Sequence, residues 1–215
     1  MLVKVKICGI TRKEDLDAAV RAGADALGFV VGVERSPRNL SSRAARELMD
    51  LLPGDVDSVA VTVFDRPRKA MDICQQLRPC FIQLHGITPE LSRENRRVFD
   101  THLIVAVNAE SPHVLESAVS YSESADALLV DSNKPDGLGG TGCTHDWNLS
   151  RKIRDAIYPV PMILAGGLTP QNVSHAIRMI RPYGVDVSTG VESRPGMKDP
   201  AKIAEFVKKA KEAIP

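Results

Sequence analysis

Reactive side chains stand at the ends of several short apolar runs in this chain. Cys8 closes a run that begins at Val3, and Asp131 directly follows Ala127–Val130. A thiol at a strand end beside a helix start can have a lowered pKa and act as a base, although most lone cysteines are small buried hydrophobic residues. An aspartate in that position can donate a proton, cap a helix or face solvent. The two residues predict acid–base chemistry only if the fold brings them together.

Two glycine-containing segments near the C-terminus carry the strongest binding signal. Gly166 and Gly167 follow one apolar run, and Ser188, Thr189 and Gly190 follow the next. Glycines allow backbone N–H groups to approach a ligand closely, and in barrel enzymes the loops after the seventh and eighth strands commonly bind phosphate. These five residues are therefore predicted to form a phosphate site.

Other candidate features give weaker signals. The glycine-rich segment 137–142 could close over a ligand, but it lacks the spacing of a dinucleotide-binding loop. Of five histidines only His85 ends an apolar run, and none shows metal-ligand spacing, so no zinc site is expected. We expect Cys74 and Cys80 to pack in the core, whereas Cys143 in the glycine-rich segment remains unassigned.

The hydrophobic pattern predicts the scaffold that must position these residues. Short aliphatic runs alternate with amphipathic segments, and runs that are apolar on nearly every residue are typical of parallel strands buried on both faces. Eight such units predict one (β/α)8 TIM barrel over residues 1–215, with an open doubly wound sheet as the alternative. The runs are Val3–Cys8, Ala26–Val31, Ser58–Val63, Phe81–Leu84, Leu103–Val107, Ala127–Val130, Met162–Ala165 and Val185–Val187.

Capping residues mark the expected helix starts. Thr11 and Glu14 have the spacing of a capping box. A capping side chain also precedes a proline at four other places, which is typical of a first helical turn. These capping residues are Thr88, Ser111, Thr169 and Asp199.

Composition excludes several classes of protein. The 28 basic and 27 acidic residues give a formal net charge of +1, so the chain lacks the electrostatic character of a nucleic-acid or anionic-membrane binder. No apolar run approaches the roughly 18 residues of a transmembrane helix, and the N-terminus lacks the pattern of a signal peptide. Four irregularly spaced cysteines without a Cys-x-x-Cys pair favour a reducing compartment, so we expect a cytoplasmic protein.

Seven motifs occur in order along the chain. They are Lys6–Thr11, Gly23–Val30, Ser36–Arg38, Gln83–Gly86, Gly140–Gly142 with Asp146-Trp147, Leu164–Leu168 with Asn172-Val173, and Gly184–Glu192. Together they resemble the phosphoribosylanthranilate isomerase family over essentially the whole chain.

The resemblance implies a TIM barrel of the phosphate-binding type that acts in tryptophan biosynthesis. Its reaction converts N-(5-phosphoribosyl)anthranilate into 1-(2-carboxyphenylamino)-1-deoxyribulose 5-phosphate by an Amadori rearrangement. This internal aldose-to-ketose shift needs neither a metal nor a cofactor. The expected partner is thus only the small-molecule substrate, and the protein is expected to be a monomer or homodimer.

The resemblance also implies roles for individual residues. Cys8 matches the general base that removes the C2′ proton, and Asp131 matches the general acid that protonates the furanose ring oxygen. Arg38 matches the arginine at the anthranilate end of the substrate. Asp186 matches an aspartate that lines the site, where His85 is also expected to contact substrate.

These roles make opposite electrostatic demands on the acid and the base. An aspartate with an ordinary pKa near 3.9 is only about 0.1% protonated at pH 7, so the pKa of Asp131 must be raised. A thiol with a pKa near 8.5 is only a few per cent thiolate at neutral pH, so Cys8 needs stabilisation of its charged form.

Two departures from the family pattern concern the loops. The segment Gly32–Arg35 is about one residue longer than usual, so Arg35 could share or replace the role of Arg38. His145 stands where the family usually has phenylalanine, which affects loop packing rather than the acid–base pair.

Two alternative functions remain open from the sequence. One is a different phosphate-binding barrel enzyme, such as a thiamine-phosphate-synthase-like transferase or a pentose-phosphate epimerase. An epimerase would be expected to use a metal held by histidine and aspartate, and no such cluster is visible. The other is a non-catalytic sugar-phosphate binder, in which Cys8 and Asp131 would be dispensable.

Overall fold

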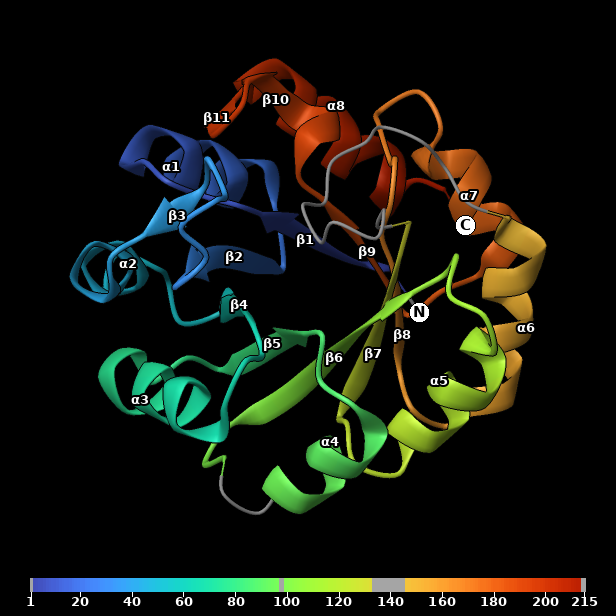
Figure 1. The fold of residues 1–215 in the computed structure, drawn as a ribbon. Coiled ribbons are helices and arrows are strands. Elements are labelled where there is room, and N and C mark those ends of the chain that lie inside the picture. The colour runs from blue at the N-terminus through green and yellow to red at the C-terminus, as the bar shows by residue number, and fades with distance from the viewer. Residues whose placement is uncertain (1, 97–98, 133–145, 214–215) are drawn as a thin grey trace.

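Eight short parallel strands form the centre of the protein (Figure 1). The structure is a computed structural model that describes residues 2–96, 99–132 and 146–213. The strands are rich in valine, isoleucine and leucine, which fit a sheet covered on both faces. They are β1 (Lys4–Cys8), β2 (Ala26–Val31), β4 (Asp57–Val63), β5 (Phe81–His85), β6 (His102–Asn108), β7 (Ala127–Asp131), β8 (Met162–Leu164) and β9 (Gly184–Val187).

The strands close into a ring. β1 pairs in parallel with β2 on one side and with β9 on the other, while the remaining neighbours follow chain order. The predicted (β/α)8 barrel is therefore confirmed, and the open-sheet alternative is wrong. Closure depends on pairing between the first and last strands, which hydrophobic periodicity does not reveal.

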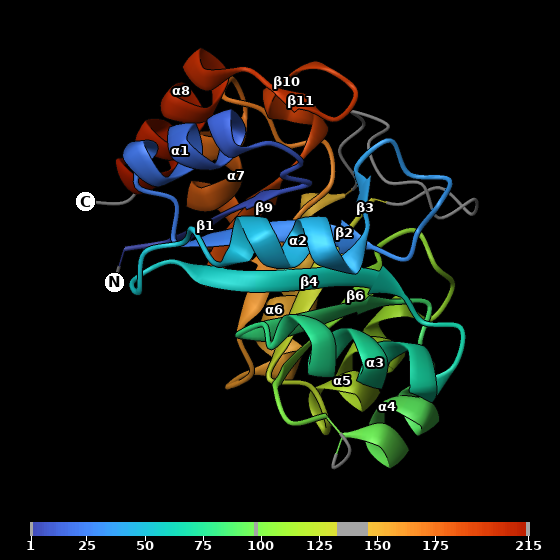
Figure 2. The same ribbon diagram turned by 90° about the vertical axis from the view of Figure 1, so that its left-hand side faces the viewer.

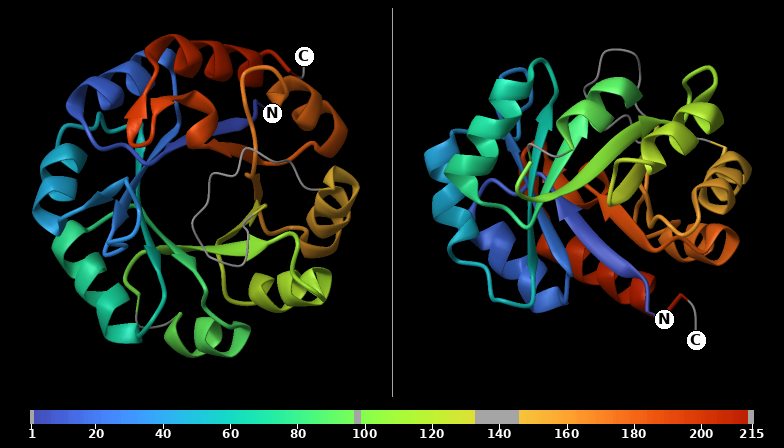
Figure 3. Two further views of the ribbon diagram at one scale, coloured as in Figure 1. Left: turned by 45° about the horizontal axis from the view of Figure 1, so that its top comes forward. Right: turned by 90° about the horizontal axis from the view of Figure 1, so that it is seen from below.

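Helices surround the ring, as Figures 1 and 3 show. They are α1 (Lys13–Ala22), α2 (Ser42–Met49), α3 (Pro67–Leu77), α4 (Pro89–Asn95), α5 (Val114–Ser122), α6 (Trp147–Ile157), α7 (Val173–Ile180) and α8 (Pro200–Lys211). None of the helices in the described part of the chain has the length and apolar character that a membrane crossing requires.

Small additional elements occupy the loops that follow β2 and β9. The sequence pattern did not predict them, because they are only two or three residues long. They are β3 (Asn39–Leu40), the 3₁₀ turn η1 (Thr189–Val191), β10 (Glu192–Arg194) and β11 (Met197–Lys198). β10 and β11 form an antiparallel hairpin in which Glu192 lies opposite Lys198.

The side chains of each strand alternate between two packed layers, and this alternation decides which site residues point into the barrel. Leu128 and Val130 of β7 belong to the large core between the barrel and its helices, whereas Ala127 and Leu129 belong to a smaller cluster inside the barrel. Because successive side chains point to opposite faces, the next residue, Asp131, faces inward. The same alternation directs Cys8 into the inner cluster.

The loops that follow the strands gather at one end of the barrel (Figure 2). Both chain termini lie at the other end, where the strands begin. The substrate-binding end of a TIM barrel is the end where strands finish.

The predicted helix caps are partly wrong. Thr88 and Asp199 accept hydrogen bonds from backbone N–H groups at the starts of α4 and α8, as expected. Thr11 does not cap α1, because its hydroxyl donates to the Gly196 carbonyl oxygen at 2.6 Å. Ser111 and Thr169 lie in turns before their helices, which begin after His113 and Asn172.

Candidate active site

A cavity of about 320 Å³ opens at the end of the barrel where the strands finish. Residues of β1, β2, β4, β5, β7 and β9 line it, together with the loops after β2, β7, β8 and β9. All ten residues predicted to form the site lie around this cavity: Cys8, Arg38, His85, Asp131, Gly166, Gly167, Asp186, Ser188, Thr189 and Gly190.

Cys8 lies beside a buried ion pair. Lys6 precedes it by two residues on the same inward face of β1, and Lys6 Nζ donates to Asp186 Oδ1 at 2.8 Å. Register explains this contact, because Lys6 pairs directly with Asp186 of β9. The lowered thiol pKa expected from the sequence is wrong: burial raises the pKa of Cys8, and the charge of Lys6 opposes that rise only in part. Sequence analysis missed Lys6, although its spacing of two from Cys8 was the signal.

Asp131 meets the requirement for a general acid. Burial, helped by the negative charge of Asp186, raises the pKa of Asp131 to about 6. At pH 7 about 10% of the side chain is then protonated, compared with about 0.1% for an ordinary aspartate. The environment therefore gives Asp131 a useful population of the proton-donating form.

Two glycine-containing turns lie between Asp131 and Cys8 around the ring of strands. β8 and β9 separate β7 from β1, so the turns after β8 and β9 lie between Asp131 and Cys8. The turns pack backbone against backbone, since a Cβ on Gly190 would lie 1.9 Å from the Leu168 carbonyl oxygen. Among the described residues, the backbone amides of Gly166 and Gly167 donate to no backbone carbonyl, and η1 begins with N–H groups that lack an intrahelical acceptor. These turns thus present donors suited to an anion.

His85 is held as a neutral ring. The Gln83 side-chain amide lies 2.9 Å from Nε2 of His85, and which of the two groups donates depends on the tautomer of the ring. Burial, with the nearby charge of Lys6, lowers the pKa of His85 to about 4. The ring can therefore offer a hydrogen bond to substrate without adding positive charge.

Arg38 and Arg35 both line the cavity, but the surrounding residues hold only the side chain of Arg38 in place. Arg38 is largely buried and makes two hydrogen bonds to Glu192, at 2.8 and 2.7 Å. Its side chain lies directly over Gly9, where a Cβ would be only 2.4 Å from Arg38 Cδ. Arg35 is exposed and makes no ion pair with the described residues. The fixed guanidinium of Arg38 is the better preorganised group.

These features place the chain in one family. The family model for N-(5′-phosphoribosyl)anthranilate isomerase matches residues 5–209. The chain belongs to this family. A curated isomerase of this name from Methanothrix thermoacetophila is 44% identical over 98% of this chain and 99% of its own length. Another, from Haloarcula marismortui, is 42% identical over 99% of this chain and 98% of its own.

Solved structures of isomerases in this family have the same fold. The phosphoribosyl anthranilate isomerase of Thermotoga maritima superposes with a TM-score of 0.86 at 39% identity, covering 98% of this chain and 99% of that one. A second isomerase structure, with a TM-score of 0.83 and 38% identity, holds reduced 1-(o-carboxyphenylamino)-1-deoxyribulose 5-phosphate. It too covers 98% of this chain and 99% of its own. A thiamine phosphate pyrophosphorylase from Pyrococcus furiosus shares the fold alone, at 19% identity and a TM-score of 0.69.

Some predicted features fall elsewhere. Cys74 is half-buried in α3, but the expectation that Cys80 packs in the core is wrong, because Cys80 is exposed at the start of β5. The segment 137–142, Cys143 and His145 lie outside the described residues. Within the described ranges, no cluster of three or more histidine, cysteine, aspartate or glutamate side chains could hold a metal ion.

Proposed function

We propose that the protein converts N-(5′-phosphoribosyl)anthranilate into 1-(2-carboxyphenylamino)-1-deoxyribulose 5-phosphate, the aldose-to-ketose isomerisation of tryptophan biosynthesis. The observation that carries this proposal is the single cavity shared by Cys8, Asp131 and the two phosphate-type turns. Asp131 has the raised pKa that a proton donor for ring opening requires. Burial also raises the pKa of the Cys8 thiol, and the charge of Lys6 beside it partly offsets that rise in favour of the thiolate.

The cavity can hold the substrate in one orientation. The phosphate would bind the backbone amides of the turns after β8 and β9, on the side where Gly166 and Gly190 lie. The opposite side contains Val30, Val61 and Val63, an apolar wall suited to the aromatic ring. Arg38 follows β2, and its side chain reaches over Gly9 to Glu192, between this wall and the turn after β9. Its guanidinium could pair with the ring carboxylate there.

In this orientation the ribose lies in the cavity between Cys8 and Asp131. Asp131 would act as the proton donor and Cys8 as the proton acceptor. Asp131 would give its proton to the furanose ring oxygen, so that the C1′–O bond breaks and the nitrogen lone pair forms a C1′=N bond. Cys8 thiolate would then take the C2′ proton, and the electron pair of that C–H bond forms C1′=C2′ while the π pair of C1′=N returns to nitrogen. The resulting enol tautomerises to the ketone, so C2′ is oxidised and C1′ is reduced within one molecule.

Other properties follow from the same proposal. We propose that a small sugar phosphate is its only required partner, that no metal or organic cofactor takes part, and that the protein works in the cytoplasm. It would act as a monomer or a homodimer. The isomerase of Thermotoga maritima is described as dimeric, which favours testing for the second state.

Turnover of the proposed substrate tests the function directly. Purified protein without added metal is expected to consume phosphoribosylanthranilate, followed as the loss of its anthranilate-type fluorescence. Protein heated to unfold it is the control for spontaneous substrate decay. Intact substrate after incubation with folded protein would exclude the isomerase and favour the non-catalytic binder.

The pKa of Asp131 predicts an unusual pH profile for kcat/KM. Because Asp131 must be protonated and Cys8 deprotonated, the rate should rise about tenfold per pH unit up to pH 6, as thiolate accumulates. Above pH 6 each gain in thiolate is offset by loss of protonated Asp131, so the profile should be flat. It should fall again above the raised pKa of Cys8.

Initial rates at low substrate concentration between pH 5 and 10 measure this profile. In Asp186→Asn, the break near pH 6 should move to lower pH, because the charge that helps to raise the pKa of Asp131 is gone. A wild-type rate that keeps climbing tenfold per unit from pH 6 to 8 would contradict the acid role of Asp131.

A further inference from the structure

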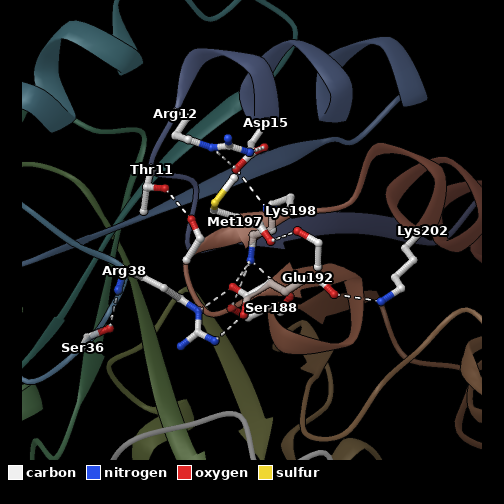
Figure 4. Close-up of polar contacts among 12 residues, drawn as sticks. Thr11, Arg12, Asp15, Ser36, Arg38, Ser188, Glu192, Met197, Lys198 and Lys202 are labelled. Carbon is white, nitrogen blue, oxygen red and sulfur yellow. Dashed lines mark hydrogen bonds and ion pairs between the residues drawn. The ribbon is translucent and has the colours of Figure 1, made fainter.

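A buried carboxylate that the proposed reaction does not use lies between two cations behind the cavity (Figure 4). Glu192 of β10 accepts hydrogen bonds from Arg38 Nε at 2.8 Å and Nη2 at 2.7 Å. Lys198 Nζ donates at 2.9 Å to Glu192 Oε1, the same oxygen that accepts from Arg38 Nε. The side chains of Glu192 and Lys198 are only 4% and 0% exposed, so solvent does little to screen this cluster.

The contact with Glu192 uses one specific edge of the Arg38 guanidinium. A guanidinium can pair with a carboxylate through its Nε and Nη2 side or through its Nη1 and Nη2 end. Glu192 occupies the side, and among the described residues Nη1 makes no hydrogen bond. Figure 4 shows the third nitrogen of Arg38 pointing away from Glu192. The Nη1 and Nη2 end of the guanidinium can thus bind a second carboxylate.

Lys198 connects Glu192 to the turn after β9. Its Nζ donates to the Ser188 carbonyl oxygen at 3.1 Å and lies 3.4 Å from the Ser188 hydroxyl. The backbone N–H of Lys198 is itself fixed by Asp15 of α1, at 3.0 Å. The carboxylate that holds Arg38 is therefore anchored to the backbone of the phosphate-type turn.

We propose that Glu192 is a positioning residue that holds Arg38 side-on, so that the end of its guanidinium faces the cavity and binds a carboxylate of the ligand. The identity of that carboxylate, the anthranilate group, rests on the proposed function. The proposal itself requires only a carboxylate ligand.

The charges of the cluster are consistent with a carboxylate ligand. Burial alone would raise the pKa of Glu192, but hydrogen bonds from Arg38 and the charge of Lys198 outweigh burial and lower it. Glu192 is thus ionised and neutralises one of two neighbouring cations. Burial lowers the pKa of Lys198, and Glu192 opposes that shift. With Arg38 and Lys198 both protonated, one positive charge remains, and a single ligand carboxylate at Arg38 would balance it.

Glu192→Asp is the sharpest test, because it keeps the charge and shortens the side chain by one methylene. With anthranilate as the probe, the dissociation constant is expected to rise about tenfold, which corresponds to losing one charged hydrogen bond. Inorganic phosphate should bind within about threefold of wild type. The KM for phosphoribosylanthranilate should rise with little change in kcat, because Arg38 binds a remote group. Glu192→Gln, which keeps the size but loses the charge, should weaken anthranilate binding as well.

Lys202→Met is the matched control for general loosening of the hairpin. It removes a 2.8 Å hydrogen bond to the Glu192 carbonyl oxygen but leaves the carboxylate in place. Anthranilate should bind this variant as it binds wild type, and equal weakening in Lys202→Met and Glu192→Asp would overturn the proposal. Unchanged or tighter anthranilate binding in Glu192→Asp, or no binding to wild type, would also overturn it. Because these probes need no turnover, an inactive wild type that shows the expected pattern would refute only the isomerase function.

Discussion

Cys8→Ser is expected to lower kcat by at least about 10²-fold, the smaller end of the effect of general acid–base catalysis. Serine fits the same place at the end of β1, but its hydroxyl is a much weaker acid, so the basic form is not populated near neutral pH. Because Cys8 acts in the chemical step, KM should change by less than about threefold. Steady-state kinetics with phosphoribosylanthranilate measure both constants.

The same replacement at Cys80 is the control for Cys8→Ser. Cys80 is exposed before β5, away from the cavity, and its sulfur accepts only a weak contact from Ser58 at 3.5 Å. Cys80→Ser should keep kcat within about twofold of wild type. If Cys8→Ser also retained near-wild-type kcat, another group would have to remove the C2′ proton.

The expected loss at Cys8 is large because the barrel leaves little room for a substitute base. His85 has a pKa lowered to about 4, so it is a poor proton acceptor at neutral pH. Lys6 is held charged by Asp186 at 2.8 Å. Neither neighbour is suited to take a proton from carbon.

Much of the fold was predictable because it depends on local pattern. The strands are short and aliphatic, and each inward residue at a strand end follows from alternation, as Asp131 follows Leu129. The barrel rule then places Cys8, Asp131 and the turns after β8 and β9 at one end. The positions of the candidate residues around the cavity could therefore be derived, while their catalytic roles remain predictions.

The sequence did not reveal contacts between distant segments. Lys6 and Asp186 are separated by 180 positions, and Arg38 and Glu192 by 154. Such pairs exist only because closure of the ring places β1 beside β9 and the β2 loop beside β10. Thr11 fails as a predicted cap for the same reason, since its hydroxyl donates to Gly196 in the hairpin after neighbouring β9 instead of capping its own helix.

Asp131→Asn is expected to lower kcat by at least about 10²-fold, because asparagine keeps the shape but cannot give a proton to the ring oxygen. Its residual activity should show a different pH profile. With only the Cys8 thiol titrating, kcat/KM should rise about tenfold per unit through pH 7, where the wild type is flat. Near-wild-type kcat with an unchanged profile would show that Asp131 is not the acid.

The matched control for Asp131→Asn lies at the other end of the same strand. Asp126 precedes β7 and forms an ion pair with Arg96 at 2.9 Å. Asp126→Asn makes the same chemical change far from the cavity, so kcat should stay within about threefold of wild type. Loss of activity in both variants would point to damage to β7 rather than loss of the acid.

Stability separates a catalytic from a structural role for Asp131. Its pKa is raised from 3.8 to about 6 on folding, so the folded state binds the proton more tightly and stability falls as pH rises through that window. Above pH 6 the buried Asp131 carboxylate lowers the free energy of unfolding by its full amount, about 3 kcal/mol. Asparagine carries no charge, so at pH 8 the free energy of unfolding of Asp131→Asn should exceed that of wild type. A variant that is more stable but far less active would show that the site keeps an unfavourable buried carboxylate for its chemistry.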